Sequence, residues 1–238
     1  MRRHDGRAAD QLRPLTFQLD APGWAAGRVL SQLGKTIVLC TCSIDPKVPE
    51  FLEGQGKGWL TAEYNMLPGS TQGRKTRDRG GKIDGRSVEI QRLIGRSLRA
   101  VVDLSQLGER TLWVDCDVLQ ADGGTRVTAI NGAWLAVYQA LRRTADKYGY
   151  DPDKILPESV AAVSVGLLGD EVLLDLDYLE DKDADVDVNL VMTGAGSMIE
   201  VQAGGEEATF IPEQLQEMLR LGQQGIAEIT EQQRKHLS

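Results

Sequence analysis

The residues best suited to chemistry form the short run Asp-Gly-Gly-Thr-Arg at positions 122–126. The run lies between a predicted strand over 111–119 and a predicted helix over 127–143. A helix start exposes unpaired N–H groups and the positive end of the helix dipole, so it attracts anions. The glycines allow close backbone approach, and Thr125 and Arg126 add a hydroxyl and a guanidinium. The run therefore predicts a phosphate site, although a simple turn with a solvated arginine would have the same residues.

The periodicity on either side of the run supports this placement. Apolar and acidic residues alternate before it, as in a half-buried strand: Val114, Asp115, Cys116, Asp117 and Val118. Apolar residues recur every three or four positions after it, as in an amphipathic helix: Ile130, Trp134, Val137, Tyr138 and Leu141.

A second group of candidate residues is a basic stretch between Arg74 and Arg99. It contains nine basic and three acidic residues, although the whole chain carries a formal net charge of −8. Because counterion release is a local effect, such a patch can bind a nucleic-acid backbone even on an acidic protein. Residues 67–85 are rich in Gly, Ser, Thr and charge, which predicts a long exposed loop. Residues 87–103 show the spacing of an amphipathic helix.

Several arginines of this stretch have two possible roles. Arg86 comes just before the predicted helix, where its cation could join the helix start around one anion. Arg92, Arg96 and Arg99 repeat on the face opposite the apolar one. They could contact RNA, or they could form a charged face that pairs with acidic residues elsewhere or at a subunit contact.

Acidic residues gather in the stretch 172–193, which is predicted as a β-hairpin. Its strands cover 172–178 and 184–192, and its turn covers 180–183. In the second strand, Asp185, Asp187 and Asn189 point away from the face of the apolar residues between them. Neighbouring carboxylates repel, and Mg²⁺ or Mn²⁺ on oxygen ligands is a common resolution. A fully solvated hairpin tip would explain the same residues without a metal.

The composition of the chain limits the class of protein in which such sites could function. The 238 residues, 41% of them apolar, can bury a core as one large domain or two fused lobes. No apolar run approaches the length of a membrane span, and the first residues lead into no apolar signal region, so we expect a cytoplasmic protein. Cys40, Cys42 and Cys116 form no C-x-x-C pair and are expected to be buried free thiols. Both histidines lie near a chain end, which argues against histidine-based catalysis.

Several longer blocks of the chain are more specific than any single motif. The most extensive block is EIQRLIGRSLRA, residues 89–100. The others are GWLTAEY at 58–64, DCDV at 115–118, ADGGTR at 121–126 and EEATF at 206–210. These blocks resemble the bacterial RNase PH family of phosphorolytic exoribonucleases. The resemblance runs from Asp5 to the C-terminal helix and so covers essentially the whole chain.

This resemblance implies a fold, an assembly and an activity. The implied fold is α+β, like domain 2 of ribosomal protein S5: a single domain over residues 1–238 with a mixed sheet and packed helices. Its core would cover about residues 10–210 and its C-terminal helix 212–236. The implied assembly is a homohexameric ring, a trimer of dimers. In the implied reaction, inorganic phosphate attacks the last phosphodiester of an RNA 3′ end and releases a nucleoside 5′-diphosphate. Members of the family trim tRNA precursors after the CCA end, and some act on ribosomal RNA.

The resemblance also implies roles for individual residues. The residues that match the family's phosphate-binding positions are Arg86, Gly124, Thr125 and Arg126. The acidic pair that holds a divalent metal, Mg²⁺ or Mn²⁺, or supports acid–base catalysis matches Asp181 and Asp187. The basic loop positions implicated in gripping RNA match Arg74 and Arg77.

The implied chemistry agrees with the composition. Phosphate is already nucleophilic at neutral pH, so no histidine or serine nucleophile is required. The site has to bring two polyanions together and stabilise charge on the leaving oxygen. One alternative is a non-catalytic RNA-binding ring subunit, but such subunits usually lack part of this set of residues. The other is an unrelated phosphate-binding enzyme for a small metabolite, which the basic loop disfavours.

Overall fold

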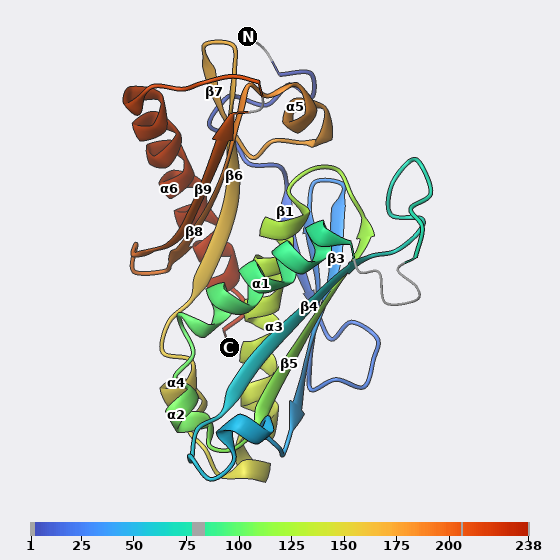
Figure 1. Ribbon diagram of the computed structural model, residues 1–238, viewed down its shortest axis with the longest axis vertical. Helices are drawn as coiled ribbons and strands as arrows, with labels where there is room; N and C mark the ends of the chain where they lie inside the picture. Colours follow the sequence, from blue (N-terminus) through green and yellow to red (C-terminus); the bar gives the residue numbers. More distant parts are fainter. Residues whose placement is uncertain (1–2, 78–83, 206, 238) are drawn as a thin grey trace.

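The computed structural model describes residues 3–77, 84–205 and 207–237, which form two β-sheets and the helices that cover them (Figure 1). The first sheet is mixed, because β4 and β5 are parallel and all its other neighbours are antiparallel. Its strands in spatial order are β1 (Leu15–Leu19), β2 (Gly27–Leu33), β3 (Thr36–Asp45), β5 (Thr111–Gln120) and β4 (Trp59–Met66).

The second sheet is antiparallel throughout. Its strands in spatial order are β7 (Glu171–Leu174), β6 (Val160–Leu168), β8 (Val186–Thr193) and β9 (Met198–Gly205). The predicted α+β class with a mixed sheet is confirmed, but the strands are divided between two sheets. In the described part of the chain, the strands of the second half pair only among themselves, because helix α3 separates them from the first sheet.

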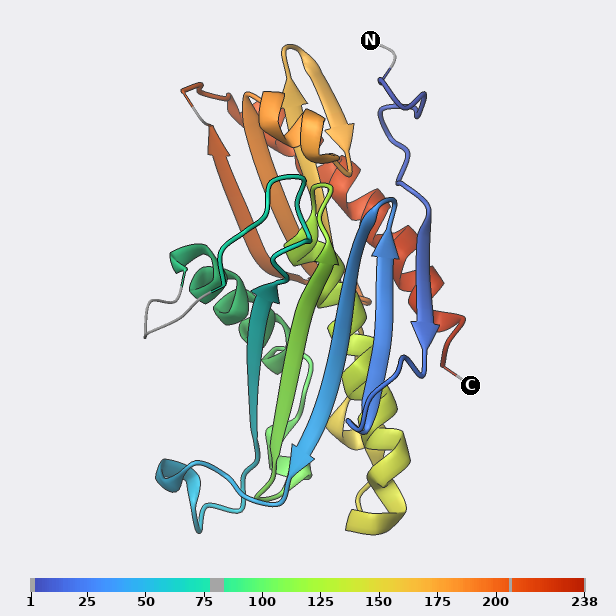
Figure 2. The ribbon, with the colours of Figure 1, turned by 90° about the vertical axis from the view of Figure 1, so that its right-hand side faces the viewer.

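Helix α3 (Thr125–Tyr148) joins the two halves. It packs on β2 and β3 of the first sheet and on β6 of the second. Figure 2 shows it against one face of the first sheet. Helix α1 (Gly85–Arg99) packs on β4 and α3, and α6 (Pro212–Arg234) covers β6, β7 and β8. Shorter helical segments are η1 (Glu50–Leu52), α2 (Leu104–Leu107), α4 (Pro152–Ile155) and α5 (Tyr178–Asp183). None of the helices in the described ranges is both long and apolar enough to span a bilayer.

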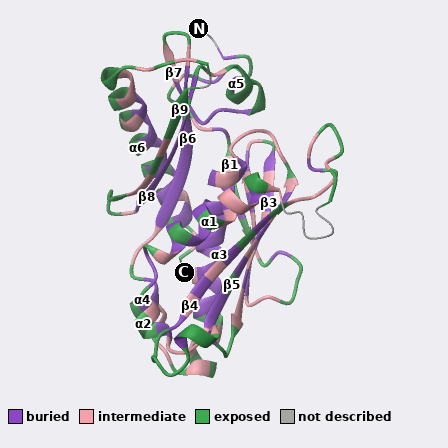
Figure 3. Cartoon of the chain, viewed as in Figure 1, coloured by how far each residue is buried: buried purple, intermediate pink, exposed green. Residues whose placement is uncertain are grey.

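Each sheet contributes to its own apolar core (Figure 3). The first core lies between the first sheet, α1 and α3 and also includes Val160, Ala162 and Val191 of the second sheet, and the second core lies between the second sheet and α6. Cys40, Cys42 and Cys116 are buried free thiols of the first core, as predicted. Burial raises the pKa of the Cys42 thiol far above its usual range, so this thiol has no reactive thiolate form at neutral pH.

The predicted hairpin at 172–193 is wrong. Strands β7 and β8 both pair with β6 and not with each other. The residues expected to form the turn belong to helix α5, which a capping box begins. Asp177 Oδ1 accepts hydrogen bonds from the N–H groups of Leu179 and Glu180 at 3.0 and 3.1 Å, and Glu180 Oε2 accepts one from Asp177 N–H at 3.1 Å.

Candidate active site

The glycine loop, residues 121–124, connects β5 to α3 as the sequence predicts. Gly123 and Gly124 adopt left-handed backbone conformations, with φ of 73° and 64°, which only glycine adopts without strain. Gly124 is the N-cap of α3, and no side chain among the described residues caps the first N–H groups of this helix. The helix start therefore keeps its donors for a ligand.

The second sheet and α5 supply the carboxylates. Asp181 lies in α5, and Asp187 lies in β8 opposite Gly166 of β6 and Gly204 of β9. Asn189, two residues further along β8, donates to Asp187 from Nδ2 to Oδ2 at 3.3 Å. Because alternate residues of a strand share a face, the acid and the amide point to the same side of the sheet.

One pocket of about 200 Å³ joins the glycine loop to these carboxylates. Its lining residues are Arg86, Gly124, Thr125, Arg126, Ser164, Asp181, Asp187 and Asn189. All six residues predicted to bind phosphate or to act as the acidic pair are therefore in contact with the same space. The lining thus combines arginines and helix N–H groups with two aspartates.

The carboxylates of Asp181 and Asp187 repel each other in this pocket. Partial withdrawal from water, and then the neighbouring Asp187 carboxylate, raise the pKa of Asp181, while Arg86 and Arg126 oppose the shift. The aspartate oxygens, with the amide of Asn189 beside them, are the hard ligands that Mg²⁺ and Mn²⁺ prefer. The donor set therefore fits a divalent cation, which would relieve the repulsion between the two acids.

Two contacts orient the groups of the helix start. Tyr64 of β4, which is buried, donates from Oη to Thr125 Oγ1 at 2.8 Å. The Thr125 hydroxyl can therefore use its own proton for another acceptor. Arg126 donates from Nη1 to Gln202 Oε1 at 3.0 Å and lies 3.4 Å from Glu89 Oε1. The guanidinium is thus held between α1 and β9 at the edge of the pocket.

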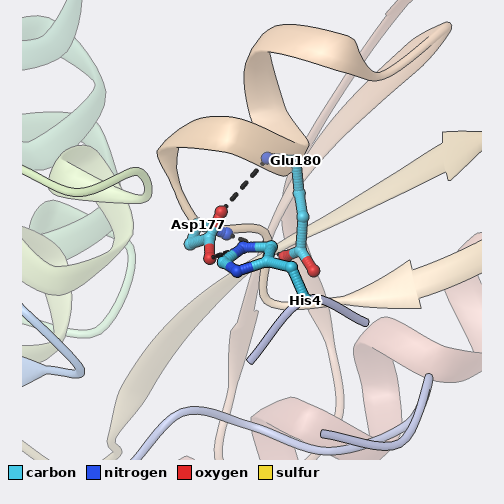
Figure 4. Close-up of side chains that lie close together, drawn as sticks. All are labelled: His4, Asp177 and Glu180. Atoms are coloured by element: carbon cyan, nitrogen blue, oxygen red, sulfur yellow. Dashed lines mark hydrogen bonds and ion pairs between the residues drawn. The ribbon is translucent and has the colours of Figure 1, made fainter. Parts of the chain in front are cut away.

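A second group of ligand-type side chains fastens α5 to the N-terminal segment (Figure 4). His4, Asp177 and Glu180 each place one ligand atom within 4.8 Å of the others. His4 Nε2 lies 2.6 Å from Asp177 Oδ2, and Arg3 Nε donates to Glu180 Oε1 at 2.7 Å. Because Asp177 also caps α5, these carboxylates already have protein partners, and the group fixes the helix that carries Asp181.

The predicted RNA-binding arginines lie outside the pocket. Arg74 and Arg77 are exposed in the loop after β4. The residues just before them, 71–73, line a larger adjoining pocket of about 410 Å³, which shares Arg86, Gly124, Thr125 and Asp181 with the first. Arg79 and Lys82 of the basic stretch lie outside the described residues.

Two other arginines of the basic stretch have partners within the chain. Arg96 Nε lies 2.5 Å from Glu200 Oε2 of β9. The Arg99 guanidinium lies over the Trp59 ring, 5.3 Å from its centroid. These contacts favour the interpretation of a charged helix face for Arg96 and Arg99.

Some residues of the site were not predicted from the sequence. Ser164 is the only hydroxyl in the otherwise apolar strand β6, and this single polar residue was the available signal. Tyr64 belongs to the block GWLTAEY, which assigned it no role, and no local pattern pointed to Arg13. Arg13 contacts the glycine loop through the Asp122 carbonyl, to which its Nη1 donates, and reaches it from a position more than a hundred residues away in sequence.

Comparisons with known proteins agree with this geometry. Residues 11–142 match domain 1 of the 3′ exoribonuclease family, and residues 158–225 match domain 2. Ribonuclease PH from Rhodopirellula baltica is 56% identical, over 97% of this chain and 96% of its own length. Ribonuclease PH from Bacillus subtilis is 52% identical, over 99% and 96%.

Solved structures show the same fold at low sequence identity. Rrp46 from rice (Oryza sativa) has a TM-score of 0.81 at 22% identity, and the match covers 99% of each chain. A chain of the Archaeoglobus fulgidus exosome, with RNA bound to the active site, has a TM-score of 0.80 at 21% identity, over 96% of this chain and 91% of that one.

The fold and the pocket together define an α+β protein that places two arginines and an uncapped helix start beside a pair of carboxylates. The full-length relatives make the class more specific. The chain belongs to the 3′ exoribonuclease family, as its sequence blocks predict. This membership confirms the predicted phosphate-dependent exoribonuclease and disfavours the non-catalytic ring subunit.

Proposed function

We propose that the pocket at the start of α3 is where inorganic phosphate attacks the 3′ end of RNA, chiefly of tRNA precursors beyond the CCA end. The observation that carries the proposal is the convergence of Arg86, Arg126 and the uncapped helix start with Asp181 and Asp187 on one pocket. Cations and N–H groups suit a phosphate, and the acids suit the reacting bond next to it.

The reaction needs no side-chain nucleophile, because inorganic phosphate attacks the RNA directly. A phosphate oxygen bonds to the phosphorus of the last phosphodiester, and the bond from that phosphorus to the 3′ oxygen breaks. The electron pair stays on the 3′ oxygen, which then gains a proton. The products are a nucleoside 5′-diphosphate and an RNA one nucleotide shorter. Arg86 and Arg126 bind and orient the attacking phosphate, since a guanidinium matches the geometry of two phosphate oxygens.

Asp181 and Asp187 would hold the divalent cation, Mg²⁺ or Mn²⁺. When bound, such a cation supplies a Lewis acid and a template for the phosphate oxygens. The raised pKa of Asp181 is also suitable for handling the proton of the leaving oxygen. The adjoining larger pocket, which reaches loop residues 71–73, offers room for the RNA end. Arg74 and Arg77 follow in the same loop, where they would bind the RNA backbone.

The proposal includes the assembly and the location of the protein. The exosome chains share its fold, and the relatives named Ribonuclease PH match it over almost their whole length. We propose a homohexameric ring, a trimer of dimers, and a cytoplasmic location. We also propose that residues 1–238 form a single domain, a proposal that the pocket supports because it takes residues from both sheets.

The test is a phosphate-dependence assay. The protein is incubated with Mg²⁺ and a tRNA that carries a few extra 3′ nucleotides, with and without inorganic phosphate, and the released nucleotides are separated by chromatography. Nucleoside diphosphates that appear only with phosphate support the proposal. Monophosphates would mean hydrolysis and would contradict the assigned phosphate site.

A further inference from the structure

Ser164 places a buried hydroxyl in the wall of the pocket, and that hydroxyl has no partner. The residue is 5% exposed, and its Oγ makes no hydrogen bond among the described residues. A buried polar atom without a partner costs on the order of 1–3 kcal/mol. Buried polar groups in folded proteins commonly hydrogen-bond to a ligand or to water, so the unpartnered hydroxyl indicates that one of the two binds here.

The position of Ser164 points its hydroxyl at the helix start. The residue lies in β6, in register with Asn189 of β8, and both line the pocket. A methyl group built on Gly124 would lie 3.9 Å from Ser164 Oγ. The hydroxyl thus lies beside the uncapped first turn of α3 without bonding to it.

The pocket that Ser164 lines has both donors and acceptors. Arg86, Arg126 and the first N–H groups of α3 are donors, and Asp181 and Asp187 supply acceptor oxygens, but neither carboxylate hydrogen-bonds to Ser164 Oγ. Beside the helix start, the hydroxyl therefore remains without an acceptor until an anion binds there. Inorganic phosphate carries several acceptor oxygens and fits the donors around it.

We infer that Ser164 is a further phosphate-binding residue, whose Oγ–H donates to the inorganic phosphate held at the start of α3. This inference rests on the proposed function of the pocket. It adds a donor from the second sheet to those of α1 and α3, so the phosphate is bound from both halves of the chain. The hydroxyl thereby helps to fix the attacking phosphate relative to Asp187, which lies two residues before Asn189 on the strand next to β6.

The test compares Ser164→Ala with wild type in two assays. The first is the initial rate of phosphorolysis against phosphate concentration, with RNA saturating, and then against RNA concentration. The second is the rise in melting temperature with added inorganic phosphate and no RNA, because a ligand that binds only the folded state stabilises it. Ser164→Thr, which keeps the hydroxyl, is the conservative variant. Thr230→Val is the matched control, because Thr230 Oγ1 in α6 is also buried and unpartnered but lies outside the pocket.

Loss of one hydrogen bond to a charged group should raise the phosphate requirement of Ser164→Ala about tenfold in both assays. The RNA requirement should not change. Ser164→Thr, which keeps the hydroxyl, should have a phosphate requirement closer to that of wild type than Ser164→Ala has, and Thr230→Val should behave like wild type. An unchanged phosphate requirement in Ser164→Ala would overturn the inference and assign the hydroxyl to a bound water. An equal rise in the phosphate and RNA requirements would also overturn it, since that indicates general damage. If wild type itself shows no phosphate dependence, the proposed function fails rather than the role of Ser164 alone.

Discussion

Arg13 and Asp175 form a buried ion pair that links the glycine loop to the segment before α5. Arg13 Nη2 lies 2.6 Å from Asp175 Oδ1, and Arg13 Nε lies 2.9 Å from Asp175 Oδ2. The side chains are 5% and 0% exposed. Arg13 Nη1 also donates to the Asp122 carbonyl of the loop. One guanidinium therefore sets the position of the anion-binding loop relative to the helix that carries Asp181.

Replacing this arginine should destabilise the fold strongly. In Arg13→Met, Asp175 keeps the backbone N–H of residue 13 at 2.7 Å and the longer contact of 3.4 Å to Arg7, but it loses both guanidinium contacts, so a buried carboxylate loses most of its charge compensation. We expect the free energy of unfolding to fall by about 3–5 kcal/mol, measured by urea titration. The control is Arg220→Met, which removes an exposed arginine from its pair with Glu217 and should change stability by less than about 1 kcal/mol. Similar losses in the two variants would contradict the proposed role of the buried pair.

Gly123 is required at a second contact between the same two segments. A methyl group at this position would lie 2.6 Å from the carbonyl carbon of Asp177 and 2.8 Å from the carbonyl oxygen of Leu176. Gly123→Ala must therefore push the glycine loop away from α5. Since small misplacements of reacting groups are costly, we expect turnover to fall on the order of 100-fold.

Gly149→Ala is the control for backbone strain. Gly149 has a φ of 68°, close to the 73° of Gly123, but nothing lies within 4 Å of the added methyl group. Gly149→Ala should lower the free energy of unfolding by about 1–2 kcal/mol, because alanine disfavours the left-handed conformation, and it should leave turnover intact. Equal turnover in the two variants would show that the contact with α5 does not position the site.

The glycine loop shows how much of the site could be predicted. Its strand and helix follow from periodicity, and its ligand groups are contiguous, so local sequence was sufficient for Gly124, Thr125 and Arg126. The carboxylates were harder. The alternation around Asp187 predicted its strand and its face correctly, but Asp181 was placed in a turn, because the capping box of Asp177 and Glu180 was not identified.

The rest of the site could not be predicted because it depends on long-range packing. Ser164 joins the pocket through the pairing of β6 with β8, and Tyr64 joins it through the parallel pairing of β4 with β5. Arg13 acts across the whole fold. Neither periodicity nor local spacing can predict these contacts between residues far apart in sequence, because they form only when the two sheets pack on α3.

Arg126→Ala should separate phosphate binding from RNA binding. The guanidinium lies at the pocket between Gln202 and Glu89, so its loss removes charge-assisted contacts to phosphate. We expect the phosphate concentration for half-maximal rate to rise about 10- to 100-fold, with RNA affinity largely kept. Filter binding and phosphorolysis kinetics measure the two effects. Arg92→Ala removes an exposed arginine from α1 and serves as the charge-matched control. Equal losses of phosphate and RNA binding in Arg126→Ala would refute its assignment.

The raised pKa of Asp181 has a consequence for stability. Partial withdrawal from water and the nearby Asp187 raise this pKa above the ordinary value of 3.8. Between the ordinary and the raised pKa, the folded protein binds more protons than the unfolded chain, so the free energy of unfolding falls as pH rises. At pH values above the raised pKa, Asp181 is ionised in both the folded and the unfolded state, and its loss of stabilising free energy is then greatest. Because the Asp181 side chain is still exposed to solvent, water screens its repulsion with Asp187 and reduces this destabilisation.

Asp181→Asn should therefore be more stable than wild type at neutral pH when divalent metal is removed by a chelator, although it should lose turnover. The gain in melting temperature should shrink as pH falls and should vanish below about pH 3, where the wild-type carboxyl is protonated in both states. Asp170→Asn, at an exposed turn, is the control and should show little change at any pH. Adding Mg²⁺ should narrow the neutral-pH difference, since the cation stabilises wild type through the carboxylates that the variant lacks. A gain that grows toward acid pH would mean that Asp181 is stabilised as an anion in the fold, and the repulsion with Asp187 would then not be what a metal relieves.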